Sequence, residues 1–154
     1  MSEERKVLEI LRFPDPRLRR KAVEVSRVNK AHKELAKDML HTMYQSNGIG
    51  LAAPQVGESI RLLVMDTRPR DTEGRYSLEG LTELEQKVEQ PLVIFNPEVV
   101  RGEGKTTYEE GCLSVPGYYE TVQRNKTILL RGLDLEGEPF EFEVDGLLAI
   151  CVQH

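Results

Sequence analysis

The sequence has few cysteines and no long apolar run, and these two shortages exclude several classes of protein. Its 154 residues contain 2 cysteines, too few for the disulfide framework of small secreted domains. No apolar run approaches the roughly 20 residues that a membrane-spanning helix needs. The N-terminus carries charged residues where a secretory signal would have an apolar core. We therefore expect a cytoplasmic protein with reduced thiols and no membrane partner.

Basic charge is also in short supply. The chain has 21 Lys and Arg against 26 Asp and Glu, a formal net charge of −5. Because binding to a phosphate backbone requires a basic surface, DNA is not an expected partner. The one basic cluster, Arg17–Lys21, is interpreted as a solvated turn, with contact to an anionic partner as the alternative. The apolar fraction of 39% and the length fit one globular domain with its own core.

The first helical pattern covers residues 29–46. Leu35, Met39 and Met43 recur at four-residue steps, which predicts one buried helical face. Asn29 is a favourable N-cap, and Asn47–Gly48 can end the helix.

Strand-like segments follow, and then a second helical pattern. Residues 60–65, 93–95, 127–133 and 140–144 have the apolar or alternating character of strands. A last helix is predicted to begin at Gly146, with Asp145 as its cap; its apolar residues share one face with the final histidine, and this face consists of Leu147, Ile150, Cys151 and His154. The pattern predicts a single α+β domain, with antiparallel or mixed strands wrapped around a central helix and an additional N-terminal helix. Residues 67–91 are polar and are interpreted as a loop insertion with room for a short helix around residues 81–88.

Cys112 is the cysteine with chemical interest. It follows two acidic residues and a glycine, which places it at a turn or strand edge, whereas Cys151 lies between apolar residues and is expected to be buried. A cysteine and a histidine far apart in sequence, here Cys112 and His154, allow two chemistries. They can form a nucleophile with its base, or contribute to a mixed Cys/His metal site. Composition and spacing leave both open.

Three segments together resemble bacterial peptide deformylases. They are Gly48–Gln55 (GIGLAAPQ), Glu110–Pro116 (EGCLSVP) and Cys151–His154 (CVQH), in that order. The resemblance covers nearly the whole chain apart from residues 67–91. The family's third motif is His-Glu-x-x-His, of which this sequence contains only the first histidine, His154. Its glutamate and second histidine would follow, so we expect the natural protein to continue beyond this residue.

The resemblance implies a metal-dependent hydrolase that removes the N-formyl group from the N-terminal formyl-methionine of nascent polypeptides. It implies one divalent metal, natively Fe²⁺, which Zn²⁺, Ni²⁺ or Co²⁺ can replace. Cys112 and His154 would be two of three metal ligands; the third ligand and the general-base glutamate are absent from the sequence. The side chain of Gln55 and the backbone N–H of Leu113 would stabilise negative charge on the formyl oxygen.

The resemblance also implies a substrate site and partners. The substrate-binding residues would be Ile49, Gly50, Tyr108, Glu110, Gly111, Leu147, Ile150 and Cys151. We expect Glu110 to anchor its loop by pairing with Arg124. The implied partners are N-formyl-methionyl peptides and the ribosome exit region. Two alternatives are a catalytically incompetent, truncated deformylase domain and a cysteine-nucleophile amidase that uses Cys112 and His154.

Overall fold

The computed structural model describes residues 6–69, 81–112 and 114–153. The helices are α1 (Lys30–Gln45), α2 (Glu83–Gln86) and α3 (Gly146–Gln153), with two short 3-10 helices, η1 (Pro16–Arg19) and η2 (Ala53–Val56). The strands are β1 (Gly50–Ala52), β2 (Leu62–Met65), β3 (Leu92–Glu103), β4 (Thr106–Cys112), β5 (Val115–Arg124), β6 (Thr127–Leu133) and β7 (Pro139–Asp145). This arrangement confirms the predicted α+β class.

A five-stranded antiparallel sheet in the order β1-β2-β3-β6-β7 separates α1 from α3. Because successive side chains of a strand point to opposite faces, neighbouring residues enter different cores. Val64 and Phe95 belong to the core that α1 covers. Met65 and Ile94 belong to the core around α3. The two helices therefore pack on opposite faces of one sheet.

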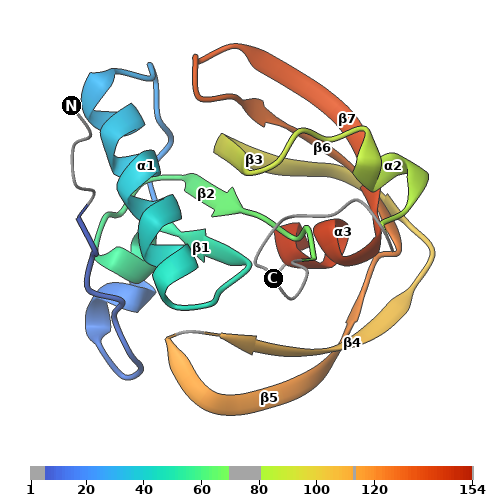
Figure 1. Cartoon of the computed structure of the whole chain (residues 1–154), viewed down its shortest axis with the longest axis horizontal. Helices are drawn as coiled ribbons and strands as arrows, with labels where there is room; N and C mark the ends of the chain where they lie inside the picture. Colours follow the sequence, from blue (N-terminus) through green and yellow to red (C-terminus); the bar gives the residue numbers. More distant parts are fainter. Residues whose placement is uncertain (1–5, 70–80, 113, 154) are drawn as a thin grey trace.

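Strands β4 and β5 form a separate two-stranded sheet. Their pairing runs from Thr106 opposite Arg124 to Cys112 opposite Val115. In Figure 1, α3 lies between this hairpin and the five-stranded sheet. Cys112 thus ends a strand on one side of α3, while the larger sheet supports the other side.

Most predicted elements lie where the sequence patterns place them. Helix α1 begins after Asn29, whose side-chain oxygen accepts the backbone N–H of His32 at 2.9 Å. Helix α2 lies inside the segment expected to hold a short helix, and α3 begins at Gly146 as predicted. Strand β3 is longer than the apolar run at residues 93–95, because it continues past Asn96 to Glu103 with a register shift. Asn96 adopts φ = 53°, a left-handed conformation that asparagine tolerates better than most residues.

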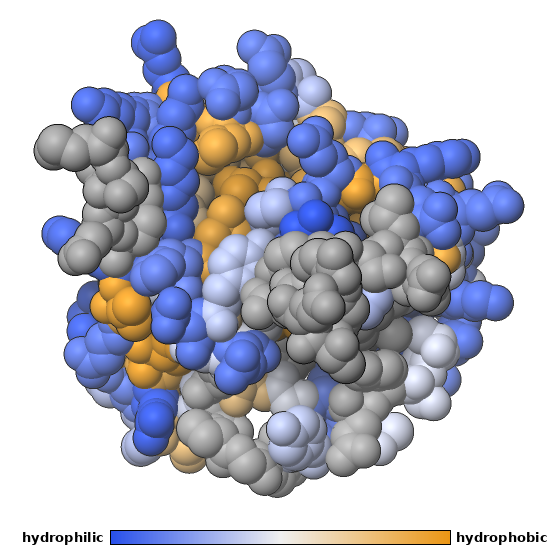
Figure 2. Space-filling model, in the orientation of Figure 1, coloured by the Kyte–Doolittle hydropathy of each residue, from blue (hydrophilic) through white to orange (hydrophobic). Residues whose placement is uncertain are grey.

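The face of the molecule seen in Figure 2 is mostly hydrophilic, and hydrophobic side chains are visible on it between α1 and the sheet. Among the residues that the structure describes, no helix combines the length and the apolar composition needed to cross a membrane.

Candidate active site

Gln55 and Cys112 lie 57 residues apart in sequence and meet in the structure. Gln55 lies in η2, directly after β1, and its Nε2 atom is 3.5 Å from Sγ of Cys112 and 3.2 Å from Oγ of Ser114. The Oε1 atom of the same side chain accepts the backbone N–H of Ala52 at 2.9 Å. Because the amide oxygen is held by Ala52, the NH₂ group is directed at the cysteine. The first two sequence motifs therefore form one site.

The N-terminal segment holds these two motifs together through backbone hydrogen bonds. The N–H of Leu11 donates to the carbonyl oxygen of Gln55 at 2.7 Å. Two residues later, the N–H of Phe13 donates to the carbonyl oxygen of Ser114 at 2.8 Å. Residues 11–13 therefore bridge η2 and the turn after Cys112, which fixes the spacing between Gln55 and the thiol.

Glu110 anchors the strand that carries Cys112, as the sequence suggested. Its buried carboxylate accepts two hydrogen bonds of 3.0 Å from Nε and Nη2 of Arg124 on the partner strand. The hydrogen bond to Glu110 raises the pKa of the Arg124 guanidinium above its ordinary value. A bidentate pair of this kind fixes both side chains in one geometry. The pair therefore holds β4 and β5 in register two residues before the thiol.

Gly111 in β4 and Gly50 in β1 are predicted substrate-binding residues that the structure describes. A Cβ atom on Gly111 would lie 2.6 Å from the ring of Tyr119, which is 63% exposed, so a side chain here would require that ring to move. Gly50 begins β1 opposite Met65, and the side chain of Ile49 before it is 43% exposed. Ile49 is thus accessible to a ligand, and its substrate-binding role stays a prediction.

The remaining predicted site residues lie partly or wholly outside the described residues. This applies to Leu113 and His154 entirely, and to the side chains of Tyr108, Leu147, Ile150 and Cys151. The backbone places Tyr108 in β4 and the other three in α3. Their roles therefore stay predictions.

Cys112 is the proposed metal ligand that the structure describes, and its surroundings suit that role. Among the side chains that the structure describes, which exclude those of Glu109, Cys151 and His154, no three His, Cys, Asp or Glu gather closely enough to hold a metal. The thiol is partly exposed, and the Gln55 amide donates toward its sulfur. The thiolate is the form of cysteine that binds a divalent metal. The described part of the donor set therefore fits a metal site.

Three residues, one at the site and two that contact the start of α3, were not singled out from the sequence. Ser114 receives the second hydrogen bond from Gln55. Thr82 and Glu85 begin α2 as a capping box, in which Glu85 N donates to Thr82 Oγ1 and Thr82 N donates to Glu85 Oε1, both at 3.1 Å. The spacing Thr-x-x-Glu is a sequence signal for such a helix start. The spacing does not indicate which part of the protein α2 packs against.

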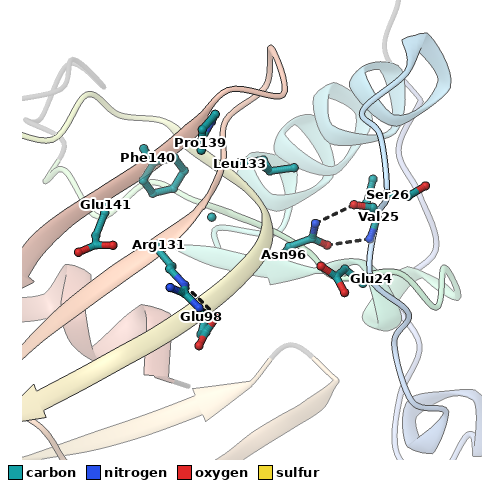
Figure 3. Close-up of a pocket in the computed structure, with 11 residues that line it drawn as sticks. Glu24, Val25, Ser26, Asn96, Glu98, Arg131, Leu133, Pro139, Phe140 and Glu141 are labelled. Atoms are coloured by element: carbon teal, nitrogen blue, oxygen red, sulfur yellow. Dashed lines mark hydrogen bonds and ion pairs between the residues drawn. The ribbon is translucent and has the colours of Figure 1, made fainter.

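A cavity of about 610 Å³ lies elsewhere, between residues 24–26 and strands β3, β6 and β7 (Figure 3). Three of its polar side chains, those of Asn96, Glu98 and Arg131, have partners within the protein. The Asn96 amide bonds to the N–H and C=O of Val25, both at 2.7 Å, and Arg131 pairs with Glu98 at 2.8 Å. The residues predicted to form the active site do not line this cavity. The cavity is therefore separate from the site around Cys112.

Comparisons with known proteins assign this arrangement to a family. The model of the polypeptide deformylase family matches residues 7–154. A peptide deformylase of Alkalilimnicola ehrlichii is 48% identical over 148 residues, which cover 96% of this chain and 74% of that protein.

Solved structures agree with this assignment. A peptide deformylase from Legionella pneumophila is 41% identical with a TM-score of 0.80, covering 97% of this chain and 78% of that one. A peptide deformylase from Ehrlichia chaffeensis in complex with actinonin is 40% identical with a TM-score of 0.81, covering 96% and 80%. The fold and the site thus define a deformylase-type hydrolase of a metal-dependent class. The chain belongs to the polypeptide deformylase family.

Proposed function

We propose that this protein removes the N-formyl group from the formyl-methionine that begins nascent polypeptides. The observation that carries the proposal is the Gln55 amide, aimed at the Cys112 thiol by the hydrogen bond between Ala52 and Gln55. Membership of the polypeptide deformylase family supports it. Its partners are N-formyl-methionyl peptides that emerge at the ribosome exit region, and its location is the cytoplasm.

Cys112 and His154 would be two of the ligands that hold a divalent metal. We propose Fe²⁺ as the native ion, with Zn²⁺, Ni²⁺ or Co²⁺ as substitutes. Thiolate and imidazole groups together suit these ions. When bound, the metal supplies a Lewis acid that makes hydroxide available near neutral pH.

Gln55 is proposed to stabilise charge on the formyl oxygen. Water adds to the formyl carbon, the C–N bond breaks, and formate and a free amine are the products. Negative charge grows on the formyl oxygen during the addition, and a fixed N–H donor stabilises that charge strongly where water is excluded. The NH₂ group of Gln55 is such a donor because its orientation is already fixed, and the Leu113 N–H would be the second. A neutral amide has the further advantage that it does not form a permanent ion pair within the site.

The methionine side chain requires an apolar slot beside this centre. We propose that its walls are Ile49, Tyr108, Leu147, Ile150 and Cys151. Gly50 and Gly111 would allow the peptide backbone close access, since neither carries a side chain. The Glu110–Arg124 pair would keep the edge of the slot in place.

The test is hydrolysis of a formyl-Met peptide by the native protein loaded with Co²⁺ or Ni²⁺. Gln55→Ala should lower kcat by about a hundredfold or more, the usual effect of removing one oxyanion donor. Gln123→Ala, at an exposed position on β5, is the matched control and should leave kcat unchanged.

Two results would contradict the proposal. Activity that resists a chelator but is abolished by a thiol alkylator would indicate the cysteine-nucleophile amidase. Absence of turnover by the metal-loaded native protein would indicate a non-catalytic domain.

A further inference from the structure

We propose that Thr82 and Glu85 of α2 are positioning residues for the deformylase site, because they fix the start of α3. This inference rests on the proposed function, since α3 leads into the proposed ligand His154. Both residues belong to the segment interpreted from the sequence as an insertion.

Glu85 caps α3 from a distant part of the chain. Its Oε2 atom accepts the backbone N–H of Leu148, the third residue of α3, at 3.1 Å across a separation of 63 residues. Its Oε1 atom accepts the N–H of Thr82 at 3.1 Å. First-turn N–H groups of a helix have no partner within the helix, and a carboxylate at this end also suits the helix dipole. Glu85 is only 3% exposed, so the carboxylate is committed to these two donors.

The contact is reciprocal. The Thr82 hydroxyl donates to the carboxylate of Asp145, the residue directly before α3. Thus α2 supplies an acceptor to the first turn of α3 and a donor to the residue that precedes it. Together, these two hydrogen bonds fix the distance and the rotation of the N-terminal end of α3 relative to α2.

Gly146 makes this close approach possible. A Cβ atom at this position would lie 2.4 Å from Oε1 of Glu85 and 2.7 Å from its Cδ. The backbone of Gly146 also has φ = +64°, which disfavours other residues. The missing side chain of Gly146 therefore leaves the space that the Glu85 carboxylate occupies.

The other end of α3 is held too. Gln153 accepts the N–H of Asn125 and donates to the carbonyl oxygen of Asn125, both at 2.8 Å. Between the two ends, Leu148 and Ala149 are fully buried against the sheet. With the far end fixed to the turn between β5 and β6, the Glu85 contact determines how α3 lies relative to Cys112. Displacements of about 1 Å in a catalytic arrangement can cost on the order of a hundredfold in rate.

The experiment compares four variants of the native protein: Glu85→Ala, Glu85→Gln, Thr82→Val and, as a charge control, Glu89→Gln at an exposed position of the same segment. The readouts are hydrogen exchange of residues 146–153, affinity for Co²⁺ with the visible absorption of the bound ion, and kcat and KM for a formyl-Met peptide. Thr82→Val keeps the shape of the side chain, so it tests the contact even if Glu85→Ala disturbs folding.

We expect faster exchange in α3 and about tenfold weaker Co²⁺ binding for Glu85→Ala, similar to losses from removing groups that orient ligands. The Co²⁺ spectrum should shift, and kcat should fall by about tenfold with KM within about twofold. Glu85→Gln keeps one acceptor oxygen, so its exchange in α3, its Co²⁺ affinity and its kcat should lie between those of Glu85→Ala and those of the unsubstituted protein. Glu89→Gln should match the unsubstituted protein.

Two outcomes overturn the proposal on its own: unchanged exchange in α3, or faster exchange with unchanged Co²⁺ affinity, spectrum and kcat. Failure of the proposed function is seen separately, in the unsubstituted protein. If that protein hydrolyses no formyl-Met peptide, the proposed function fails and the positioning role fails with it.

Discussion

Helices α1 and α3 pack on opposite faces of one sheet, yet their first turns are satisfied in different ways. In α1, Asn29 accepts the N–H of His32, three residues away, and His32 Nδ1 accepts the N–H of Asn29 in return. In α3, the corresponding acceptor is Glu85, 63 residues away. The start of α1 is therefore satisfied locally, whereas the start of α3 receives its acceptor from α2.

The difference follows from length and from position. Helix α1 has 16 residues and α3 has 8, and a helix as short as α3 is not stable without tertiary contacts. Each helix contributes to one of the two cores, but α3 also leads into the proposed ligand His154 and so must be placed relative to Cys112. Contacts from distant segments give α3 that placement, and they also make it sensitive to distant changes.

Gly146→Ala should produce the largest effect, about 3 kcal/mol of lost unfolding free energy. The methyl group would displace the Glu85 carboxylate and leave buried groups unsatisfied, which costs about 1–3 kcal/mol, and a positive φ adds about 1 kcal/mol or more for a non-glycine residue. Denaturant unfolding measures the loss. Gly104→Ala is the matched control, since Gly104 has φ = +65° but faces only the Lys126 side chain, at 3.3 Å. Equal losses in the two variants would show that the Glu85 contact contributes nothing.

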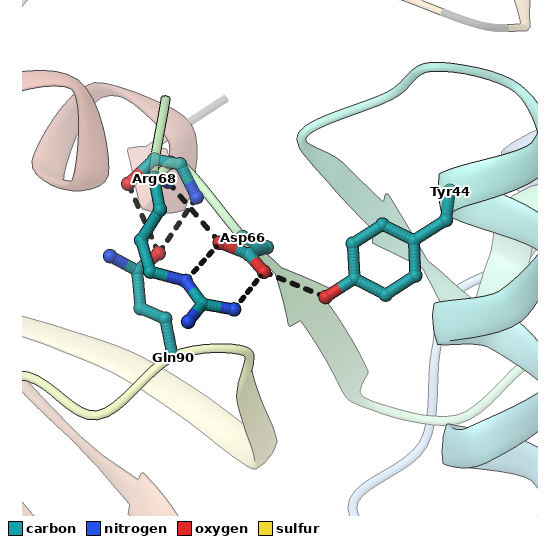
Figure 4. Close-up of polar contacts among 5 residues, drawn as sticks. Tyr44, Asp66, Arg68 and Gln90 are labelled. Carbon is teal, nitrogen blue, oxygen red and sulfur yellow. Dashed lines mark hydrogen bonds and ion pairs between the residues drawn. The ribbon is translucent and has the colours of Figure 1, made fainter. Parts of the chain in front are cut away.

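Tyr44→Phe should cost about 2 kcal/mol, the range for a hydrogen bond to a charged group. The Tyr44 hydroxyl, in the last turn of α1, donates to Oδ2 of Asp66 at 2.7 Å, and Arg68 binds both oxygens of the same carboxylate (Figure 4). This contact ties the C-terminal end of α1 to the residue that follows β2, so its loss removes a polar contact between α1 and a distant segment. Thermal or denaturant unfolding measures the effect, and a loss near zero would contradict it.

The same carboxylate should make stability depend on acidity. Burial of Asp66 opposes its ionisation, but hydrogen bonds from Arg68 and Tyr44 outweigh burial and hold its pKa below the ordinary 3.8. The stabilisation is therefore present above about pH 4 and is lost as pH falls through the lowered pKa of the folded state. The difference in unfolding free energy between the unsubstituted protein and Asp66→Asn should shrink below that pH. A difference that stays constant down to about pH 2 would contradict the assignment.

Features that depend on local contacts could be predicted from the sequence, whereas contacts between distant segments could not. The Asn29 cap and the stripe of Leu35, Met39 and Met43 depend on spacing within a few residues, and both are confirmed. Helix α3 also begins at Gly146 as predicted, although the acceptor for its first turn is distant in sequence. Membership in the deformylase family also follows from local motifs. The conformations of the α1 cap and of the buried α1 face are set by neighbouring residues, so a pattern in the sequence is sufficient to find these features.

Contacts between distant segments required the structure. Spacing alone gives no reason for Gln55 to face Cys112, and only the family resemblance linked them. The Thr-x-x-Glu signal at Thr82 predicts a helix start but leaves open which surface receives the carboxylate of Glu85. Such contacts depend on how the whole chain packs, because the two partners share no periodicity.

Asn29→Ala should cost about 1 kcal/mol, the usual value for loss of an N-cap side chain. Asn29→Asp keeps an acceptor oxygen and is the matched control, with an expected change of a few tenths of a kcal/mol. Because the cap of α1 is local and remote from Cys112, kcat for a formyl-Met peptide and the Co²⁺ affinity should not change. A fall in kcat comparable to that of Glu85→Ala would show that the two helix starts are functionally equivalent.

The smallest effect is expected at the exposed tether between α1 and the turn after β6. Lys33 Nζ lies 3.1 Å from Oε2 of Glu136, and the two side chains are 35% and 69% exposed. Exposed pairs of this kind contribute about 0.2–1 kcal/mol, and added salt screens them. A double-mutant cycle of Lys33→Gln and Glu136→Gln should give a coupling of about 0.3 kcal/mol that disappears near 1 M salt. A coupling above about 1 kcal/mol that persists in salt would mean that this pair is a specific contact and not a screened surface pair.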